Sequence, residues 1–467
     1  MAKYEPIRLD NKIFQNVDEA SLTRANAALE NGFINETGGQ TRFPGIDTFV
    51  NLPDDGKIYL NQWHGDLIAA TAVGRVYRVR QDGTTQDVTG VPLQGGKRPT
   101  FSRTEDELMM AAGGPILRLA EEQTEVLSDQ APNTTHIGYI DSYAVAIEPF
   151  SGRCFFSDPG QTRVWPALNV LTANAKPDAV TALFITDFRE MLLAGEESVE
   201  QYEPFASGDS PFYRRWTTGE TLKAPYTMVS ADNATWHLNV QKEFIRISGQ
   251  ASQPRSEDIQ LVLEGVDNWA EAWAERIHIA GQKFIVLAMP NAANPHGTTG
   301  LTLLYDYRQD RWYGLYGWDD ALGVPARWPA WSYEEIWDRH FVGCDGMIGE
   351  LKRSTRTIFG QVQRMHYRSA HISEWGEARI DNLRIRLKRG GTLNQTTEPQ
   401  ISVRVLKDNR RWTRWVRRGL GTSGERHMEL QFGSFGAATT FQLEYFVTDA
   451  AEVEIVHIDA LVERLGR

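Results

Sequence analysis

Hydrophobic and polar positions alternate over short stretches along most of the chain, and turn residues separate these stretches. Residues 66–70 form an apolar run that turns at Gly74 into residues 76–79, and the same pattern recurs at residues 108–119. Apolar runs of this length, bounded by Gly, Asn or Asp, are typical of β-strands joined in hairpins. The pattern therefore predicts an all-β fold.

The hairpins recur at a spacing that suits a repeated small sheet. Their first strands begin near residues 67, 108, 143, 191, 236, 284 and 341, so successive starts lie 35 to 57 residues apart. Four-stranded propeller blades recur at about 40–50 residues, and each blade must bury both faces against its neighbours. We therefore expect residues 31–355 to form a β-propeller-like domain of six or seven small blades. One or two irregular β-sandwiches are the alternative interpretation.

The pattern changes after Arg356. Five later segments alternate strictly with period two: residues 384–388, 401–405, 428–432, 441–446 and 453–456. This alternation is typical of antiparallel sheets with one buried face. We expect residues 356–467 to form a C-terminal β-sandwich domain that shares no sheet with the propeller. Residues 1–30 are then an N-terminal arm.

Helical periodicity is confined to two segments. Residues 18–29 are rich in Ala and Leu and acidic at their start, and residues 267–275 place Trp269 and Trp273 four positions apart. Each segment is expected to form one short helix.

The composition excludes several classes of protein. The 467 residues are 41% hydrophobic and 24% charged, which is typical of a folded globular chain and not of a disordered, collagen-like or coiled-coil chain. No apolar stretch approaches the roughly 20 residues of a membrane helix, and the first residues lack the apolar core of a secretory signal. Cys154 and Cys344 lie far apart and form no metal motif. We expect free thiols in a soluble protein made in a reducing cytosol.

The net charge of −12 is unevenly distributed. Residues 351–467 contain 20 Lys and Arg against 13 Asp and Glu, whereas the first 350 residues contain 29 against 48. The change of sign indicates two domains that face different surroundings. The acidic part argues against tight, non-specific nucleic-acid binding, because phosphate neutralisation requires Lys and Arg.

Motifs of common catalytic and metal sites are missing from the sequence. It has no P-loop, no Gly-x-Ser-x-Gly, no His-Glu-x-x-His and no Cys-x-x-Cys, and its ten histidines lack ligand spacing. We expect no catalytic site, no metal and no cofactor. The Asp-x-Gly-x-Thr core at Asp158 to Thr162 resembles the Asp-box turn of sialidase propellers, although Ser157 and Arg163 depart from that motif. A glycan-binding or glycan-cleaving propeller is therefore the alternative function.

Residues 311–318 are unusually aromatic. Trp312, Tyr316 and Trp318 are candidates for an assembly interface, because Trp, Tyr and Arg concentrate at such interfaces. The alternative is that these side chains fill the core of the last blade.

Residues 410–418 combine five arginines with two tryptophans. The candidates for an assembly interface are Arg410, Arg411, Trp412, Arg414, Trp415 and Arg417, with Arg418 adjoining. Bases can stack on Trp while Arg meets phosphate, so single-strand nucleic-acid binding is a second interpretation. A solvated strand face is the third. In one strand, Trp412 and Trp415 would fall on opposite faces, with one packed inward and the other available to a neighbouring subunit.

The order of several motifs resembles the tail-hub proteins of short-tailed bacteriophages, also called nozzle or packaged-DNA stabilisation proteins. The motifs run through the whole chain: residues 31–35 (Asn-Gly-Phe-Ile-Asn), 43–46 (Phe-Pro-Gly-Ile), 197–202, 303–306 leading to Trp312, 343–346 with 349–351, and a strand-rich terminal domain from about Arg379. Each motif alone is short, and their order carries the resemblance.

This resemblance implies a structural, non-enzymatic virion protein. Such a protein forms a homohexameric ring below the portal and adaptor, closes the DNA channel and retains the packaged genome. Its implied partners are the adaptor, a tail fibre or tailspike, a tail plug or needle, and passing double-stranded DNA without sequence readout. It inserts in no membrane and resides in the virion tail after assembly in the host cytoplasm. We further expect the first 350 residues to give the ring a net negative inner surface, since weak repulsion lets a duplex slide.

Overall fold

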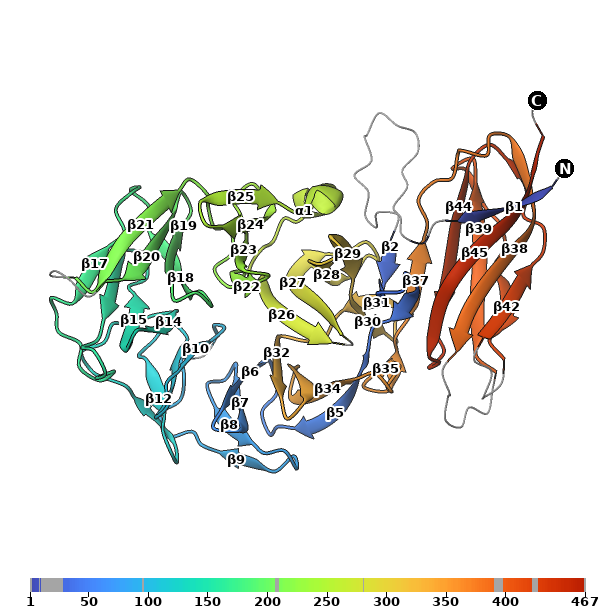
Figure 1. Ribbon diagram of the computed structural model, residues 1–467. Coiled ribbons are helices and arrows are strands. Elements are labelled where there is room, and N and C mark those ends of the chain that lie inside the picture. Colours follow the sequence, from blue (N-terminus) through green and yellow to red (C-terminus); the bar gives the residue numbers. More distant parts are fainter. Residues whose placement is uncertain are drawn as a thin grey trace.

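The chain folds into a ring of small sheets with a sandwich packed at one side of it, as the computed structural model shows (Figure 1). The structure describes residues 2–7, 9, 28–94, 96–205, 210–279, 281–389, 398–421 and 427–465. Within these ranges, helix is confined to a 3-10 turn at Glu257–Ile259 and to α1 (Gln260–Glu264). No described helix is long and apolar enough to cross a membrane.

Five blades are each built from four consecutive antiparallel strands. They are β6 (Ile58–Trp63), β7 (Asp66–Thr71), β8 (Val76–Val79) and β9 (Thr85–Asp87); β10 (Thr100–Arg103), β11 (Leu108–Ala111), β12 (Leu117–Leu119) and β13 (Thr124–Val126); β14 (Ile137–Ile140), β15 (Tyr143–Ile147), β16 (Arg153–Phe156) and β17 (Val170–Thr172); β18 (Val180–Ile185), β19 (Met191–Gly195), β20 (Val199–Pro204) and β21 (Phe212–Thr218); and β22 (Val229–Ala231), β23 (Ala234–Leu238), β24 (Phe244–Ser248) and β25 (Ala251–Pro254).

The last two blades complete a ring of seven. Strands β26 (Trp273–Ile279), β27 (Gln282–Ala293), β28 (Thr299–Asp306) and β29 (Arg311–Gly314) form the sixth, and a hairpin of β30 (Tyr316–Asp319) and β31 (Val324–Arg327) follows. The seventh contains β32 (Ser332–Ile336), β33 (Arg339–Gly343) and β34 (Met347–Lys352), and β5 (Gly45–Asn51) from near the N-terminus supplies its fourth strand. The expected propeller of six or seven blades is therefore confirmed.

The second strand of a blade is buried on both faces, which explains its unbroken apolar run. In β7, Ile68 and Ala70 pack with Leu108 and Met110 of the next blade, whereas Leu67 and its neighbours pack toward the seventh blade. The outermost strands β9 and β25 are fully exposed and polar. Alternate residues of each second strand thus face opposite neighbours, so the ring buries surfaces that no blade could bury alone.

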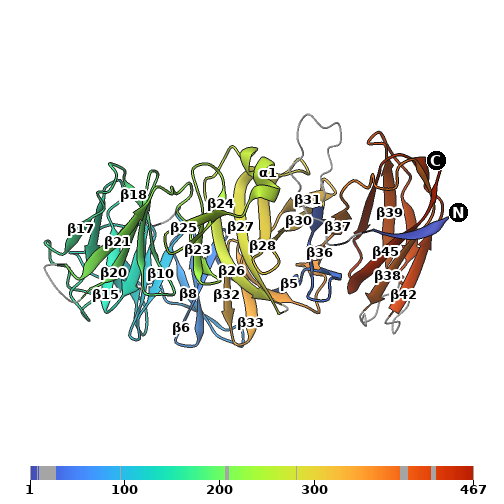
Figure 2. The ribbon, with the colours of Figure 1, turned by 45° about the horizontal axis from the view of Figure 1, so that its top comes forward.

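The sandwich is built from both ends of the chain (Figure 2). One sheet contains β3 (Gly32–Ile34), β4 (Gln40–Arg42), β45 (Val453–Arg464), β38 (Ala378–Arg389) and β42 (His427–Phe432), with β1 (Lys3–Ile7) on β45 and β43 (Gly436–Ala438) on β38. The other contains β37 (Met365–Arg368), β44 (Phe441–Val447) and β39 (Gln400–Lys407), with β40 (Arg411–Trp412) and β41 (Val416–Gly419) both on β39. A C-terminal β-sandwich is therefore present as expected.

The expectation that the two regions share no sheet was wrong. The strand β2 (Ala28–Glu30) pairs in parallel with β29 of the sixth blade and antiparallel with β37 of the sandwich. One ten-stranded sheet consequently runs from β26 to β40. The three residues of β2 are buried, and sharing this strand pairs the edges of β29 and β37, which would otherwise leave backbone groups unpaired.

The strand pairing also corrects the expected domain boundaries of 31 and 355. Residues 32–42 lie in the sandwich, the propeller begins at Gly45, and β35 (Thr357–Ile358) with β36 (Gln361–Val362) extends the seventh blade beyond residue 355. Within the expected arm, Lys3–Ile7 is a strand of the sandwich. Strand pairing between distant segments sets these boundaries, and the local pattern of hydrophobic residues cannot show which distant strands pair.

Both expected helices require correction. Residues 28 and 29 are strand, and residues 18–27 of the expected helix lie outside the described residues. In the second segment, residues 267–272 are loop and turn, and Trp273 begins β26 with a completely buried side chain. Burial of the Trp273 side chain in the blade core favours a strand there, although its i, i+4 spacing from Trp269 suggested a helix.

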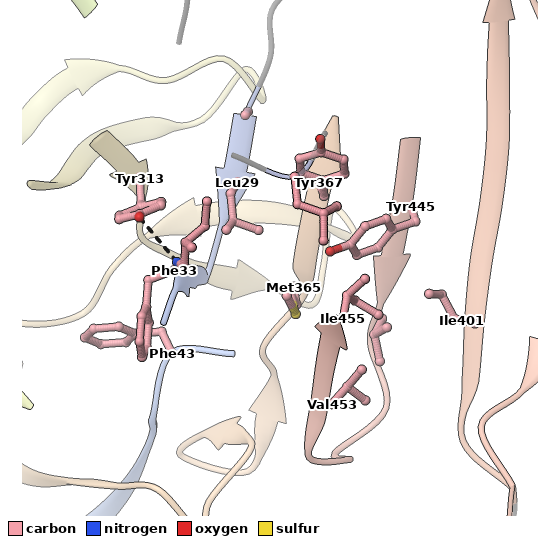
Figure 3. Packing of buried hydrophobic residues seen from close by; sticks show 14 of the residues in the cluster. Leu29, Phe33, Phe43, Tyr313, Met365, Tyr367, Ile401, Tyr445, Val453 and Ile455 are labelled. Carbon is pink, nitrogen blue, oxygen red and sulfur yellow. Dashed lines mark hydrogen bonds between the residues drawn. The ribbon is translucent and has the colours of Figure 1, made fainter. Parts of the chain in front are cut away.

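A single apolar core continues through the joint between the two regions (Figure 3). Phe43 packs against Phe284 of the sixth blade, with ring centroids 6.4 Å apart. Leu29 and Met365 lie between these rings and Tyr445 of the sandwich. The propeller and the sandwich are therefore joined by apolar packing as well as by the shared sheet.

Candidate interaction surface

The aromatic tract at residues 311–318 is mainly core. Trp312 and Tyr316 are each 1% exposed, and the ring of Trp312 stacks on Tyr305 at 4.6 Å. The indole N–H of Trp312 donates to the Arg255 carbonyl at 2.7 Å. The assembly-interface prediction is therefore wrong for Trp312 and Tyr316, because both side chains fill the space between the fifth and sixth blades. Trp318 is half-buried, and the Arg364 guanidinium lies 6.0 Å from its ring centroid.

The arginine-rich segment lies at the open edge of the sandwich. Strands β40 and β41 each pair with β39 alone, and residues 413–415 interrupt them. The side chains of Arg410, Arg411, Arg414, Arg417 and Arg418 are all exposed. No ion pair within the described part of the chain involves any of these five arginines. Their charge is therefore available to a partner, as the candidate assembly interface requires.

The two tryptophans of this segment do not lie on opposite faces, so that prediction was wrong. The Arg404 guanidinium lies 4.1 Å from the ring centroid of Trp412 and 4.3 Å from that of Trp415. The break at residues 413–415 ends the alternation and brings both indoles to one cation. Trp415 also meets Phe446 edge to face, with centroids 4.7 Å apart. Both rings are half-buried and serve to hold Arg404.

Arg404 is in turn held by a buried carboxylate. Its Nε donates to Glu444, which also accepts a hydrogen bond from Arg368 at 2.8 Å. The Glu444 side chain is only 4% exposed. Although burial by itself would raise the pKa of Glu444, its cationic donors hold that pKa well below its ordinary value. The exposed arginine edge thus rests on a fixed, buried ionic cluster, which sequence reasoning did not identify.

The axis of the propeller contains a cavity of about 390 Å³, lined by residues of the inner strands. Arg98 crosses it from the second blade and donates to Glu275 of the sixth blade and to the Trp331 carbonyl. Burial raises the pKa of Glu275 to about 7 and that of Glu334 to about 7. This cavity on the propeller axis therefore contains two carboxyl groups that take up a proton close to neutral pH.

The Asp-box-like segment does not use its side chains as an Asp box does. Asp158 accepts from the Asn169 amide at 3.0 Å, and the Thr162 hydroxyl donates to Glu107. Backbone bonds close the turn, with the Gln161 N–H donating to the Asp158 carbonyl at 3.1 Å. Both motif side chains therefore bind other side chains instead of the backbone N–H groups of the turn.

Groups of three or more potential metal ligands are not found among the described residues. Both cysteines are free and buried. Burial raises the pKa of the Cys154 thiol to about 12, so this thiol stays protonated at neutral pH.

Comparison with known proteins finds similarity to solved structures only. No protein-family model matches the chain, and no curated protein matches it. The structure is similar to the WD40 β-propeller domain of Doa1, with 10% sequence identity, a TM-score of 0.41, and coverage of 67% of this chain and 99% of that domain. It is also similar to the extracellular domain of a one-component system of B. thetaiotaomicron, with 10% identity and a TM-score of 0.46. That match covers 90% of this chain, which spans 62% of the matched chain.

Proposed function

We propose that this protein is a structural subunit of the tail hub of a short-tailed bacteriophage. In this proposal, six copies form a ring below the adaptor, close the DNA channel, and carry a tail fibre or spike and a plug. The order of sequence motifs suggests the family, and the strand-rich propeller with its appended sandwich is compatible with a structural subunit.

The observation that carries the proposal is the charge of the sandwich edge. Five exposed arginines, which have no ion pair among the described residues, lie on or beside β40 and β41. The first 350 residues, in contrast, contain 48 acidic against 29 basic side chains. Complementary surfaces of opposite charge favour association and fix its register. A head-to-tail contact between the arginine edge of one copy and the acidic propeller of the next would generate a closed ring if the rotation closes.

The buried contacts of the two tryptophans favour protein association over single-strand nucleic-acid binding. Stacking of bases needs free aromatic faces, and both Trp412 and Trp415 already contact Arg404. Binding of nucleic acid through the arginines alone would weaken steeply with salt.

The test is the native mass of the purified protein with and without the adaptor ring. A ring of six 52.8-kDa chains weighs about 317 kDa. The double variant Arg414→Glu and Arg417→Glu is expected to remain a folded monomer that forms no ring. Charge reversal of two exposed cations of the propeller, Arg80→Glu and Lys223→Glu, is the matched control and is expected to assemble.

A wild-type chain that stays monomeric even with the adaptor would contradict the hub itself. A normal ring from the Arg414 and Arg417 double variant would contradict only the arginine edge as its interface. The net negative lumen stays a prediction of this proposal, and a structure of the assembled tail tests it. A lumen lined mainly by Arg and Lys of the propeller would contradict it.

A further inference from the structure

The joint between propeller and sandwich contains a buried histidine between two carboxylates. Glu30 on β2 stands opposite Gly314 of the sixth blade and opposite His366 of β37. His366 Nδ1 lies 2.9 Å from Glu30 Oε2, and its Nε2 lies 2.7 Å from Glu444 Oε1. The three side chains are each no more than 7% exposed. The imidazole therefore bridges the strand shared with the propeller and a strand of the sandwich.

These two distances decide which protons the imidazole carries. An ionised carboxylate only accepts hydrogen bonds, and a neutral imidazole has one N–H donor and one lone pair. A neutral His366 would therefore place a nitrogen lone pair against a carboxylate oxygen at 2.7 or 2.9 Å without a proton between them. Only the imidazolium form, with two N–H donors, satisfies both contacts.

The surrounding charges keep both carboxylates ionised. Glu30 also accepts from Arg364 at 3.4 Å and contacts His296 Nε2 at 2.9 Å. Glu444 accepts from Arg368 and Arg404. His366 and His296 hold the pKa of Glu30 well below its ordinary value, although burial alone would raise it. The nearby Tyr316 phenol stays neutral, because burial raises its pKa. The exchangeable proton of this cluster therefore resides on a histidine.

We propose that His366 is a proton-dependent latch, which in its imidazolium form fastens β2 and the sixth blade to β44 of the sandwich. Loss of its proton removes one of the two hydrogen bonds and leaves a lone pair facing a carboxylate. The latch then opens on one side, and the sandwich gains freedom relative to the propeller. This inference concerns one chain and does not depend on the proposed ring.

The direction of the pH response follows from the raised pKa of His366. Burial opposes the charge, but Glu30 and Glu444 outweigh it and move the pKa above its ordinary value of 6.5. A group whose pKa rises on folding stabilises the fold fully below its unfolded pKa and loses this contribution as pH rises through the folded value. The joint is therefore tight at and below pH 6, and it loosens as pH rises through the raised pKa of His366.

The experiment measures the distance between the two regions in the full-length monomer. Nitroxide labels at Glu122→Cys in the second blade and Thr439→Cys in the sandwich occupy exposed positions, whereas both native cysteines are buried. Double electron–electron resonance is expected to give a narrow distance distribution at pH 6 and a broad one at pH 9. In His366→Gln, the distribution is expected to be the same at both pH values.

Two matched controls separate the latch from other histidines. His457→Gln removes a histidine whose Nε2 lies 2.6 Å from Asp459 within the sandwich, and it is expected to keep the wild-type response. His296→Gln removes the other imidazole on Glu30 and is expected to keep a pH response as well. An unchanged wild-type distribution between pH 6 and pH 9 would overturn the proposal without any variant. A full pH response in folded His366→Gln would overturn it equally.

Discussion

The propeller and the sandwich are assembled from strands in different ways. Each of the first five blades is made of four consecutive strands. The sandwich instead combines strands from residues 3–42 with strands from residues 365–464. It also buries charged groups, including Glu444, His366 and Arg42. Local sequence thus builds the blades, and long-range pairing builds the sandwich and its joint.

Arg42 links the N-terminal and C-terminal segments of the sandwich by hydrogen bonds. Its guanidinium donates to the carbonyls of Gln363, Val447, Asp449 and Ala451. These acceptors lie more than 300 residues away along the chain. The two terminal nitrogens of this buried arginine donate to backbone oxygens alone, which ties the N-terminal strand β4 to the C-terminal half of the domain.

Loss of apolar packing at the joint should destabilise the fold more than any other change considered below. Phe43→Ala removes a completely buried ring that contacts Phe33, Phe284 and Trp328. We expect it to lower the free energy of unfolding by about 3–5 kcal/mol. Because this core spans both regions, hydrogen exchange should accelerate in the propeller and in the sandwich together.

Met110→Ala is the comparison for Phe43→Ala, since Met110 is equally buried but packs only between the first two blades. Its effect on hydrogen exchange should concentrate in the propeller. Equal acceleration of the sandwich in this variant would contradict the difference between the two regions.

The next effect concerns the buried charges of the sandwich. Glu444→Gln leaves Arg368, Arg404 and His366 without their common carboxylate. Breaking a buried ion pair from one side costs about 3 kcal/mol or more. Urea unfolding followed by circular dichroism measures this loss. The variant Glu429→Gln, at an exposed ion pair with Arg386, is the control and should cost less than about 1 kcal/mol.

A smaller, pH-dependent effect on stability is expected at Glu334, in the cavity on the propeller axis. Burial raises the pKa of Glu334 from 4.5 to about 7. Ionisation is therefore harder in the folded than in the unfolded chain, and the stability of the wild type falls as pH rises from about 4.5 to 7. Glu334→Gln removes this decline and should raise stability at pH 8 by about 1–2 kcal/mol. Melting midpoints at pH 5 and pH 8 measure the difference, and an equal change at both would contradict it.

The smallest effect on stability is expected at the arginine edge. Arg414→Glu with Arg417→Glu changes two exposed side chains without an ion pair among the described residues. We expect the free energy of unfolding of the monomer to change by no more than about 0.5 kcal/mol. A larger loss in thermal unfolding would mean that these arginines stabilise the sandwich itself.

The blade pattern and the sandwich strands could be predicted from the amino-acid sequence, because both follow from local apolar periodicity and turn residues. The runs of β7 and β11 predict strands covered on both faces, and the period-two alternation from residue 384 predicts a sheet with one buried face. The sequence also identified the exposed arginines of residues 410–418, since five cations in nine residues cannot all be buried.

The way in which the two regions are joined could not be predicted from local sequence. Strand β2 has three residues, too few for a periodic signal, and its role comes from partners at residues 314 and 366. The alternation of Arg364, just before β37, with His366 and Arg368 of that strand was the available signal for the ionic cluster. This alternation did not identify the carboxylates that accept from these side chains, because Glu30 and Glu444 lie 336 and 78 residues from His366 in the sequence. Such contacts depend on strand pairing between distant segments, which no local pattern encodes.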